Sequence, residues 1–394
     1  MTTGELTARL AGRAFDIGQA AWNACADPDG ATSPHPFTRY EFFDAVEASG
    51  SAAARTGWRP LHLVVERNHR IEGILPLYLK NHSQGEYVFD HAWADALERA
   101  GGDYYPKLQA SVPFTPATGR RFLIAQGADA LETTSALLGA GMSAVKELKA
   151  SSLHITFMTE EEWHMAGAAG YLQRTDQQFH WENRDYSSFG QFLAELSSSK
   201  RKNLRKEREA VRAERVEFDW LTGSDLSESV WDTFFEFYMD TGGRKWGHPY
   251  LTRNFFSRIG TSMADQILLV MAKRNGRYIA GALNFFGDGV LYGRNWGCSE
   301  FVPFLHFETC YYQAIEFAIA RGLRKVEAGA QGEHKLLRGY LPTPTYSAHH
   351  IAHPGLRRAV DDYLTHEREA VAEQIEELAE HAPFRKADVS RGEN

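Results

Sequence analysis

The sequence predicts a mixed α/β (α+β) protein made of two successive domains of similar construction. Each half of the chain runs from helices into a pair of strands about a polar turn, at 61–80 and again at 267–286, and then into further strand and helix segments. The order of secondary-structure elements repeats in the two halves, but no stretch of residues does. A chain of 394 residues is long enough for about two domains. We expect them at residues 1–170 and 171–394.

The composition is typical of a soluble globular protein. Hydrophobic residues make up 43% of the chain and charged residues 24%, and no apolar run is long enough to span a membrane. The N-terminus lacks the basic start and apolar core of a secretory signal. The three cysteines, Cys25, Cys298 and Cys310, are too few and too far apart for a disulfide framework or a zinc knuckle, so we expect a cytoplasmic protein without a metal. The net charge of −8 argues against a surface that coats nucleic acid generally.

The elements of the first half follow from local patterns. Leu61–Glu66 and Ile71–Lys80 have strand composition and flank a tight polar turn, which predicts a β-hairpin. A short helix is expected before it at Tyr40–Ala48. After it we expect an Ala- and Leu-rich helix at Ala128–Lys149 and a strand at Ser152–Met158.

The second half repeats this order. A strand-like piece at 179–183 precedes a long helix predicted over 189–215, and a Phe-rich helix follows at 230–241. The remaining expected elements are a hairpin at 267–274 and 278–286 about Asn275-Gly276, a strand at 290–296 and a charged helix at 355–381.

The stretch Leu305–Pro342 gathers the densest group of polar side chains. Phe307, Tyr311, Ile315 and Ala318 recur at helical spacing, and Gly322 stands where a helix C-terminal glycine is expected. A short strand at 325–328 follows, and a Gly-punctuated loop then carries Glu333, His334, Lys335, Arg338 and Tyr340.

This loop is the predicted catalytic segment. A helix that feeds a strand whose exit loop carries charge is a usual way for an α/β enzyme to build a site. The imidazole of His334 is a natural general base near neutral pH, and Lys335 and Arg338 can stabilise a developing oxyanion. The alternative is an ordinary polar surface loop.

A basic helix is the second feature. Residues 200–215 carry eight basic side chains against three Glu, and the arginines from Arg201 onward line one face. Like charges one turn apart repel each other unless an anion relieves them, which favours a phosphate-bearing ligand or nucleic acid. A solvated face with pairs such as Arg205–Glu209 is the alternative. The predicted donor-phosphate ligands are Lys200, Arg201, Arg205 and Arg208.

The triplet His306-Phe307-Glu308 resembles part of a zinc-deaminase motif. That chemistry also needs a paired-cysteine P-C-x-x-C, which the chain lacks, so we do not expect zinc. His306 and Glu308 are instead expected to be hydrogen-bonded groups at a helix start, and they remain candidate proton acceptors.

Aromatic and polar residues alternate in segments that lack the periodicity of a core. We expect them to line a substrate pocket, because core residues would show cleaner spacing. The predicted substrate-binding residues are Glu86, Asp90, Tyr104, Tyr105, Lys107, His180, Trp181, Arg294, Trp296 and Arg338.

Motifs of several other chemistries are missing from the sequence. There is no phosphate loop, no dinucleotide-binding GxGxxG, no GxSxG nucleophile elbow and no HExxH. A repeated α/β order without nucleotide motifs points to acyl transfer.

Short blocks spread over about residues 35–365 resemble a bacterial Fem-like family of the GNAT acyltransferase superfamily. They include GEYVFD (85–90), QFHW (178–181), KRKNLRKER (200–208), LYGRNWG (291–297) and GAQGEHK (329–335). Members are labelled peptidoglycan biosynthesis/recognition proteins or N-acetyltransferases. The resemblance implies two tandem GNAT-like domains, each a mixed, mainly antiparallel sheet flanked by helices.

The resemblance also implies amide formation by transfer from acyl-CoA or aminoacyl-tRNA, used as a co-substrate rather than a tightly bound cofactor. The chain differs from the family pattern in two ways, so the identity of the donor stays undecided between the two. The basic, Gly-rich acetyl-CoA loop of ordinary GNAT enzymes is not evident between Trp296 and Leu305, and the long coiled-coil arm of the tRNA-using enzymes is missing.

We therefore expect an acyl or aminoacyl transferase that acts on an amine of a peptidoglycan precursor, peptide or small molecule. Glu333, His334, Glu308 or His306 would accept the amine's proton, unless the substrate supplies its own base. Cys310 lies within a predicted helix with no evident base, which argues against a covalent cysteine mechanism. The alternative is a non-catalytic peptide- or glycan-binding protein that retains the fold.

Overall fold

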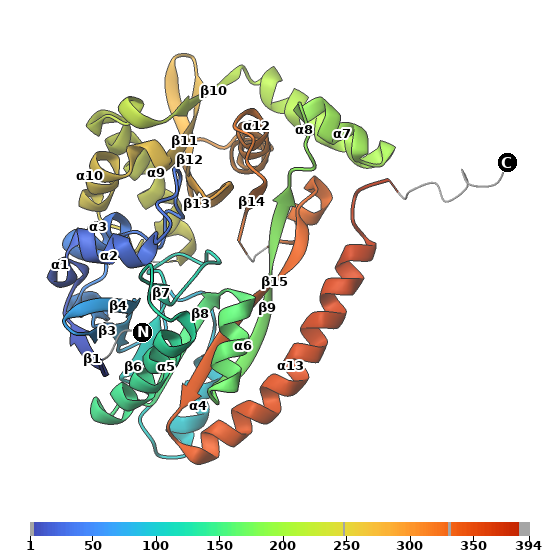
Figure 1. Cartoon of the computed structure of the whole chain (residues 1–394). Helices are drawn as coiled ribbons and strands as arrows, with labels where there is room; N and C mark the ends of the chain where they lie inside the picture. Colours follow the sequence, from blue (N-terminus) through green and yellow to red (C-terminus); the bar gives the residue numbers. More distant parts are fainter. Residues whose placement is uncertain (1–3, 247–248, 330–331, 386–394) are drawn as a thin grey trace. The chain divides into compact units, whose positions relative to one another are not determined.

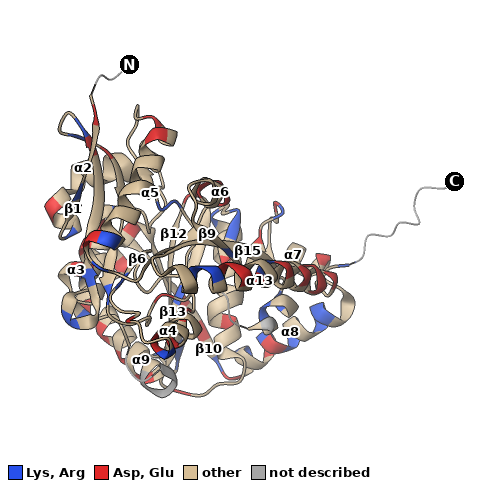
Figure 2. Cartoon of the chain, turned by 90° about the horizontal axis from the view of Figure 1, so that it is seen from below, with Lys and Arg blue, Asp and Glu red and all other residues tan. Residues whose placement is uncertain are grey.

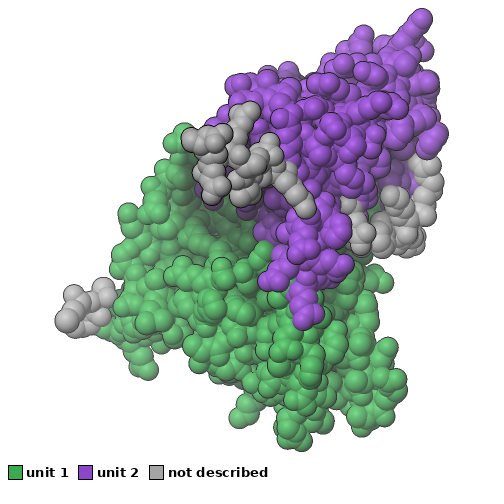
Figure 3. Space-filling model, turned by 90° about the vertical axis from the view of Figure 1, so that its right-hand side faces the viewer, with its two compact units in different colours: residues 1–176, 248–266, 344–372 green, residues 177–247, 267–343, 373–394 purple. Residues whose placement is uncertain are grey.

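The computed structural model describes residues 4–246, 249–329 and 332–385. The chain forms two compact units, each assembled from separate segments (Figure 3). Unit 1 contains residues 1–176, 248–266 and 344–372, and unit 2 contains residues 177–247, 267–343 and 373–394. The first crossing follows Asp176, near the boundary at 170 expected from the sequence, whereas the sequence did not predict the later exchanges of segments.

The core of unit 1 forms where helix α5 packs on strands of two sheets. One sheet has four antiparallel strands in the order β1-β3-β4-β7, and the other strands follow the order β15-β8-β6-β5-β2, with β6 and β8 parallel. Asp129 caps α5 by accepting a hydrogen bond from the Glu132 amide at 2.9 Å. The strands of unit 1 are β1 (Leu6–Ala11), β2 (Trp58–Pro60), β3 (His62–Arg67), β4 (Arg70–Leu75), β5 (Tyr78–Lys80), β6 (Lys107–Ala110), β7 (Leu123–Ile124) and β8 (Ser152–Met158). Its helices include α1 (Ala14–Ile17), α2 (Gln19–Ala26), α3 (Tyr40–Ala48), α4 (His91–Arg99), α5 (Ala130–Glu147), α6 (Glu160–Ala168) and α10 (Arg253–Ser262).

Unit 2 is built on strands in the order β10-β11-β12-β13-β14-β9 (Figure 1). Neighbouring strands are antiparallel except β13 and β14, which run parallel. Helix α9 packs on β12 and β13, and α12 packs on β13 and β14. The strands are β9 (Leu172–Glu182), β10 (Val216–Leu221), β11 (Ile267–Arg274), β12 (Arg277–Gly287), β13 (Val290–Cys298) and β14 (Lys325–Glu327). The helices include α7 (Phe189–Glu195), α8 (Ser198–Ala213), α9 (Glu228–Trp246), α11 (Leu305–Phe307), the π-helical η4 (Glu308–Tyr312), α12 (Gln313–Ala320) and the 3₁₀ helix η5 (Glu333–Arg338).

The chain crosses between the units within three elements. These are β9, β15 (Leu341–Ile351) and the long C-terminal helix α13 (Pro354–Glu380). No helix in the described part of the chain combines the length and apolar character needed to cross a membrane.

Most elements predicted from the sequence are confirmed, including the helices α3 and α5 and the hairpin β11–β12. Two predictions were wrong. The helix expected over 189–215 is broken, because Leu196 adopts an extended backbone and its buried side chain joins the core of unit 2. The strand expected over 71–80 ends at Leu75 and resumes at Tyr78 in the other sheet of unit 1. Pro76 lies in the gap and cannot donate a hydrogen bond to continue the ladder.

Gly297 of β13 allows α9 to pack closely on the sheet of unit 2. A Cβ at this position would lie 2.2 Å from the Phe237 carbonyl oxygen, so the substitution Gly297→Ala must push backbone apart. We expect it to destabilise the protein by about 1–3 kcal/mol in urea unfolding.

The matched control for that substitution is Gly139→Ala in the middle of α5. Gly139 is exposed, and a Cβ there would meet nothing within 4 Å. This variant should gain about 0.5–1 kcal/mol from helix propensity. Equal effects of the two substitutions would contradict the close packing of β13 on α9.

Candidate functional site

Unit 2 gathers aromatic and basic side chains where the pairing of two parallel strands ends. β13 and β14 pair only from Val290/Lys325 to Tyr292/Glu327, and β13 then continues to Cys298. Beyond that point lies a group that we call the strand-end cluster, formed by Trp296, His306, Phe307, Tyr311 and His334. Its ring centroids are 5.2 Å apart for Trp296–His306, 5.4 Å for His306–Tyr311 and 5.4 Å for Phe307–His334.

Local backbone geometry delivers these side chains to one place. Phe304, with a φ of 64°, turns the chain from the loop after β13 into α11. The helix then widens into the π-helical segment η4, which carries Tyr311. Such insertions are often found at functional sites. The Tyr311 carbonyl accepts a hydrogen bond from the Tyr340 hydroxyl at 3.3 Å.

His334 and Tyr311 are hydrogen-bonded partners within the cluster. His334 Nε2 lies 3.0 Å from the Tyr311 hydroxyl. Burial lowers the pKa of His334, and the nearby charges of Arg338 and Lys335 lower it further, so the imidazole is neutral at pH 7. Burial also raises the pKa of Tyr311, which therefore keeps its proton. A neutral imidazole beside a protonated phenol can accept and pass on a proton.

Gly332 makes room for this imidazole. Its φ is 101°, and a Cβ there would lie 2.3 Å from His334 Cε1 and 2.6 Å from Nδ1. The position therefore requires glycine on two counts, backbone conformation and space.

Lys335 and Arg338, which the sequence predicted to stabilise a developing oxyanion, are buried. Lys335 donates to the carbonyls of Ala328 and Gly329, the latter at 3.0 Å, and burial lowers its pKa to about 8. Arg338 donates to Glu207 Oε1 at 2.7 Å and to the His334 carbonyl at 2.7 Å. Its guanidinium carbon also lies 3.5 Å from the centre of the Phe307 ring. Both side chains therefore hold η5 and the exit of β14 in position.

Glu308 is buried in an ion pair. Arg208 of α8 donates to its two carboxylate oxygens at 3.0 and 2.7 Å and also pairs with Glu316 at 2.8 Å. Glu308 accepts a further bond from Gln313 at 2.8 Å. Glu308 therefore serves as a buried counter-charge of Arg208. The ion pair also removes Arg208, which is 8% exposed, from the predicted phosphate-binding face.

The other predicted donor-phosphate residues lie on α8, where Figure 2 shows lysines and arginines along the helix. Arg205 is exposed, and Lys200 and Arg201 are half-buried. Lys202, Lys206 and Arg212 are further exposed cations of the same helix.

Predicted residues on the strands of unit 2 have different environments. Arg294 and Trp296 are half-buried on the part of β13 that extends beyond β14. Trp181 is buried in the hydrophobic core. His180 is also buried, which lowers its pKa to about 4, and its Nε2 lies 4.0 Å from Glu327 Oε1. The side chain of Glu333 lies outside the described residues.

The substrate-binding residues predicted in the first half meet in a second place, inside unit 1. Lys107 donates to Glu86 at 2.7 Å, to Ser83 at 2.8 Å and to Asp90. The Tyr104 hydroxyl donates to Asp90 at 2.7 Å, and Tyr105 reaches the network through Ser83 at 2.9 Å.

This buried network also holds groups that the sequence did not single out. His154 and His349 face each other with their Nδ1 atoms 2.7 Å apart, and Lys80 lies 3.6 Å from Glu86. Burial raises the pKa of Glu86 to about 7 and lowers that of Lys80 to about 7. All these side chains except Tyr105 are buried, so the network is a closed interior cluster rather than an open pocket wall.

The contact of Tyr311 with His334 was not predicted, because the helical spacing of Tyr311 assigned it to the core. Its hydroxyl, on an otherwise apolar stripe, was the one available indication that it needed a polar partner. His154 and His349 are far apart in the sequence, and nothing in their local patterns indicates that they meet.

Comparisons with known proteins place this geometry in context. A family model named FemAB-like and described as peptidoglycan biosynthesis/recognition matches residues 13–386. No curated protein matches the chain.

Among solved structures, FemX superposes with a TM-score of 0.54 at 13% identity, over 88% of this chain and 98% of FemX. L-PGS from Bacillus licheniformis superposes with a TM-score of 0.51 at 10% identity, over 85% of this chain and 99% of that one. The predicted fold class, a mixed α/β chain of two units in which helices flank mixed, mainly antiparallel strands, is thereby confirmed.

The buried ion pair of Glu308 generates a stability prediction. Glu308→Gln should destabilise the protein by about 2–3 kcal/mol in urea unfolding, because Arg208 then lacks one of its buried counter-charges. Glu316→Gln is the control. Its side chain is 29% exposed, against 4% for Glu308, so the loss should be smaller. If instead Glu308→Gln leaves stability unchanged, the ion pair does not hold η4 to α8.

Proposed function

The chain belongs to the FemAB-like family of peptidoglycan biosynthesis/recognition proteins, and on that premise we propose that it is a transferase that forms an amide from an acyl or aminoacyl donor and an amine acceptor. The observation that carries this proposal is the neutral His334 hydrogen-bonded to the protonated Tyr311 at the ends of β13 and β14. Amide formation from an ester or thioester requires both a proton acceptor for the amine and a proton donor for the leaving group.

In the proposed reaction the acceptor amine attacks the carbonyl carbon of the donor. His334 Nδ1 accepts the amine's proton, in the tautomer in which Nε2–H donates to the Tyr311 hydroxyl. The tetrahedral intermediate collapses, the carbon–oxygen or carbon–sulfur bond breaks, and Tyr311 protonates the leaving group. The Nε2 proton then restores the phenol and leaves the imidazole protonated on Nδ1. Exchange of the ring protons with water returns His334 to the Nε2–H tautomer, so one proton passes in all from amine to leaving group.

The part of β13 that extends beyond β14 supports an extended acceptor or donor. From Gly293 to Trp296 the strand remains paired with β12 on one side, continues beyond its described pairing with β14 on the other, and is half-buried. A strand edge of this kind can bind a ligand that carries amide groups, by adding it as a further strand. Peptidoglycan precursors and other peptides have this chemistry, and so does an amide-bearing acyl carrier such as CoA. We therefore propose a peptide-like acceptor and place Arg294 and Trp296 beside it.

Exposed cations of α8 are the proposed contact for donor phosphates. Arg205, together with the half-buried Lys200 and Arg201, remains for this role, while Arg208 is bound to Glu308 and Glu316. Both candidate donors, acyl-CoA and aminoacyl-tRNA, carry phosphates that such a face attracts.

His334→Ala should lower kcat by about 10²–10³-fold, because it removes the proposed base while sparing the elements that position it. His334→Gln should lower it as much, since an amide can bond Tyr311 but cannot accept the proton. The rate of the unaltered protein should fall only below pH 6.5, the ordinary pKa of histidine, because the imidazole is neutral above its lowered pKa. The variants should lack this acidic limb.

The measurement is transfer of a labelled acyl group from acetyl-CoA or from aminoacyl-tRNA to a peptidoglycan-precursor peptide. The exposed His366 supplies the control, and His366→Ala should behave as the unaltered protein. Full turnover in His334→Gln would move the site elsewhere, with the unit 1 network as the next candidate. Tight peptide binding without any turnover would favour the recognition function that the family description also names.

The double variant Arg201→Glu/Arg205→Glu should raise the KM of the true donor by about tenfold and flatten its dependence on salt. The same reversal at Arg99 and Lys146, exposed cations of α4 and α5, is the control and should change neither quantity. If the KM values of acetyl-CoA and aminoacyl-tRNA both stay unchanged, the basic face of α8 is only a solvated surface.

A further inference from the structure

A short loop of unit 2 exposes two phenylalanines. Residues 299–304 connect β13 to α11, and in this loop Phe301 is 90% exposed and Phe304 is 43% exposed. In the described part of the chain no other large hydrophobic residue is as exposed as Phe301. Two exposed aromatic side chains in one short loop make it a candidate interaction site.

The exposure of Phe301 is not the result of a loosely held chain. Val302 and Leu305 are buried and pack with Val211 of α8 in one hydrophobic cluster. On the other side, the Ser299 amide donates to the Ile279 carbonyl at 2.9 Å. The loop is thus anchored at both ends, and the Phe301 side chain projects from a fixed position.

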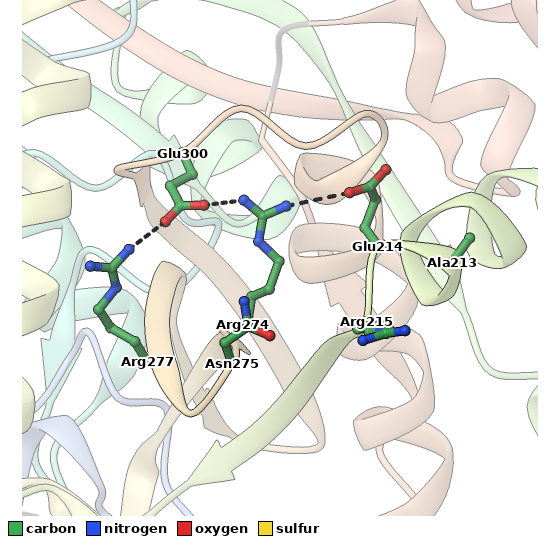
Figure 4. Close-up of a pocket in the computed structure, with 7 residues that line it drawn as sticks. All are labelled: Ala213, Glu214, Arg215, Arg274, Asn275, Arg277 and Glu300. Carbon is green, nitrogen blue, oxygen red and sulfur yellow. Dashed lines mark hydrogen bonds and ion pairs between the residues drawn. The ribbon is translucent and has the colours of Figure 1, made fainter.

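A cationic cavity adjoins this loop (Figure 4). Glu300, the residue before Phe301, lies between Arg274 and Arg277 and pairs with Arg277 at 2.8 Å. Arg274 also forms an ion pair with Glu214 at 3.4 Å. Figure 4 draws no interaction between Arg215 and the other residues that line the cavity. The cavity has a volume of about 640 Å³ and is lined by Ala213, Glu214, Arg215, Arg274, Asn275, Arg277 and Glu300.

The lining is net positive although the chain as a whole is not. It contains three arginines against two glutamates, and the exposed Arg212 in the last turn of α8 adds a further positive charge nearby, whereas the chain carries a net charge of −8. Guanidinium groups form planar, bidentate hydrogen bonds to phosphate. The surface therefore combines exposed aromatic rings with phosphate-matching cations.

We propose that this face of unit 2 docks on the surface of an anionic phospholipid bilayer. Phe301 and Phe304 would enter the boundary between headgroups and acyl chains, which aromatic rings favour, and Arg215 and Arg277 would contact lipid phosphates. A free phosphate would account for the arginines but leave the exposed phenylalanines unexplained. The proposal does not depend on the transfer reaction.

The test is co-sedimentation of the full chain with vesicles of phosphatidylcholine alone and of phosphatidylcholine mixed with phosphatidylglycerol. Binding should require the anionic lipid and weaken as salt is added. Phe301→Ser should reduce the partition coefficient by about tenfold, since it removes a large apolar side chain. Arg277→Gln and Arg215→Asn should each reduce it by about fivefold. Asn suits position 215, where φ is 56°.

Phe15→Ser is the matched control. Phe15 of unit 1 is 64% exposed and also has an arginine beside it, with the Arg13 guanidinium carbon 5.6 Å from its ring centre. This variant should bind vesicles as the unaltered protein does. Equal losses in Phe15→Ser and Phe301→Ser, or no preference for anionic vesicles, would overturn the proposal. So would full competition by soluble glycerol phosphate, or a dimer in light scattering that Phe301→Ser dissociates without any binding to vesicles.

Discussion

Arg208 is the side chain on which the geometry of unit 2 depends. It lies between Glu308 and Glu316, so one guanidinium fixes α8 to the π-helical segment η4 and to α12. η4 carries Tyr311, and Tyr311 orients His334. Burying an ion pair costs free energy of desolvation. Removing one partner of a buried pair destabilises the protein strongly, because the other charge is then left buried without a counter-charge. The position of the proposed catalytic pair is therefore set by a contact one helical layer away from it.

A second charged residue of α8 also binds the segments around the strand-end cluster. Glu207, the neighbour of Arg208, accepts hydrogen bonds from Arg338 and from the Tyr312 hydroxyl. Two adjacent residues of α8 thus hold the two segments that frame the strand-end cluster, η4 and η5. In unit 1 a comparable role falls to Lys107, which connects Glu86 and Asp90. In both units, buried charges in reciprocal pairs fix the loops and helices that adjoin the strand ends.

The sequence predicted much of the fold, because most elements rest on local patterns. The helix α5 and the hairpin β11–β12 follow from periodicity and turn residues alone. The break at Leu196 was beyond such reasoning, since it depends on that side chain joining the core, which is a tertiary effect. The same limit applies to charge. An arginine stripe on α8 predicts an anion, but a sequence cannot say whether that anion is a ligand's phosphate or, as for Arg208, the protein's own Glu308.

The residues of the candidate site could be named from the sequence, but their contacts could not. The sequence predicted a catalytic segment from Glu-His-Lys followed by Arg338, in which Lys335 and Arg338 would stabilise a developing negative charge. Both instead bind protein groups, and both lower the pKa of His334 through their charge, in addition to burial. A protonated imidazole is therefore disfavoured in this position, so His334 is suited to pass a proton on rather than to hold it. The adjacent Tyr311 hydroxyl, at 3.0 Å, is the group that makes such a relay possible.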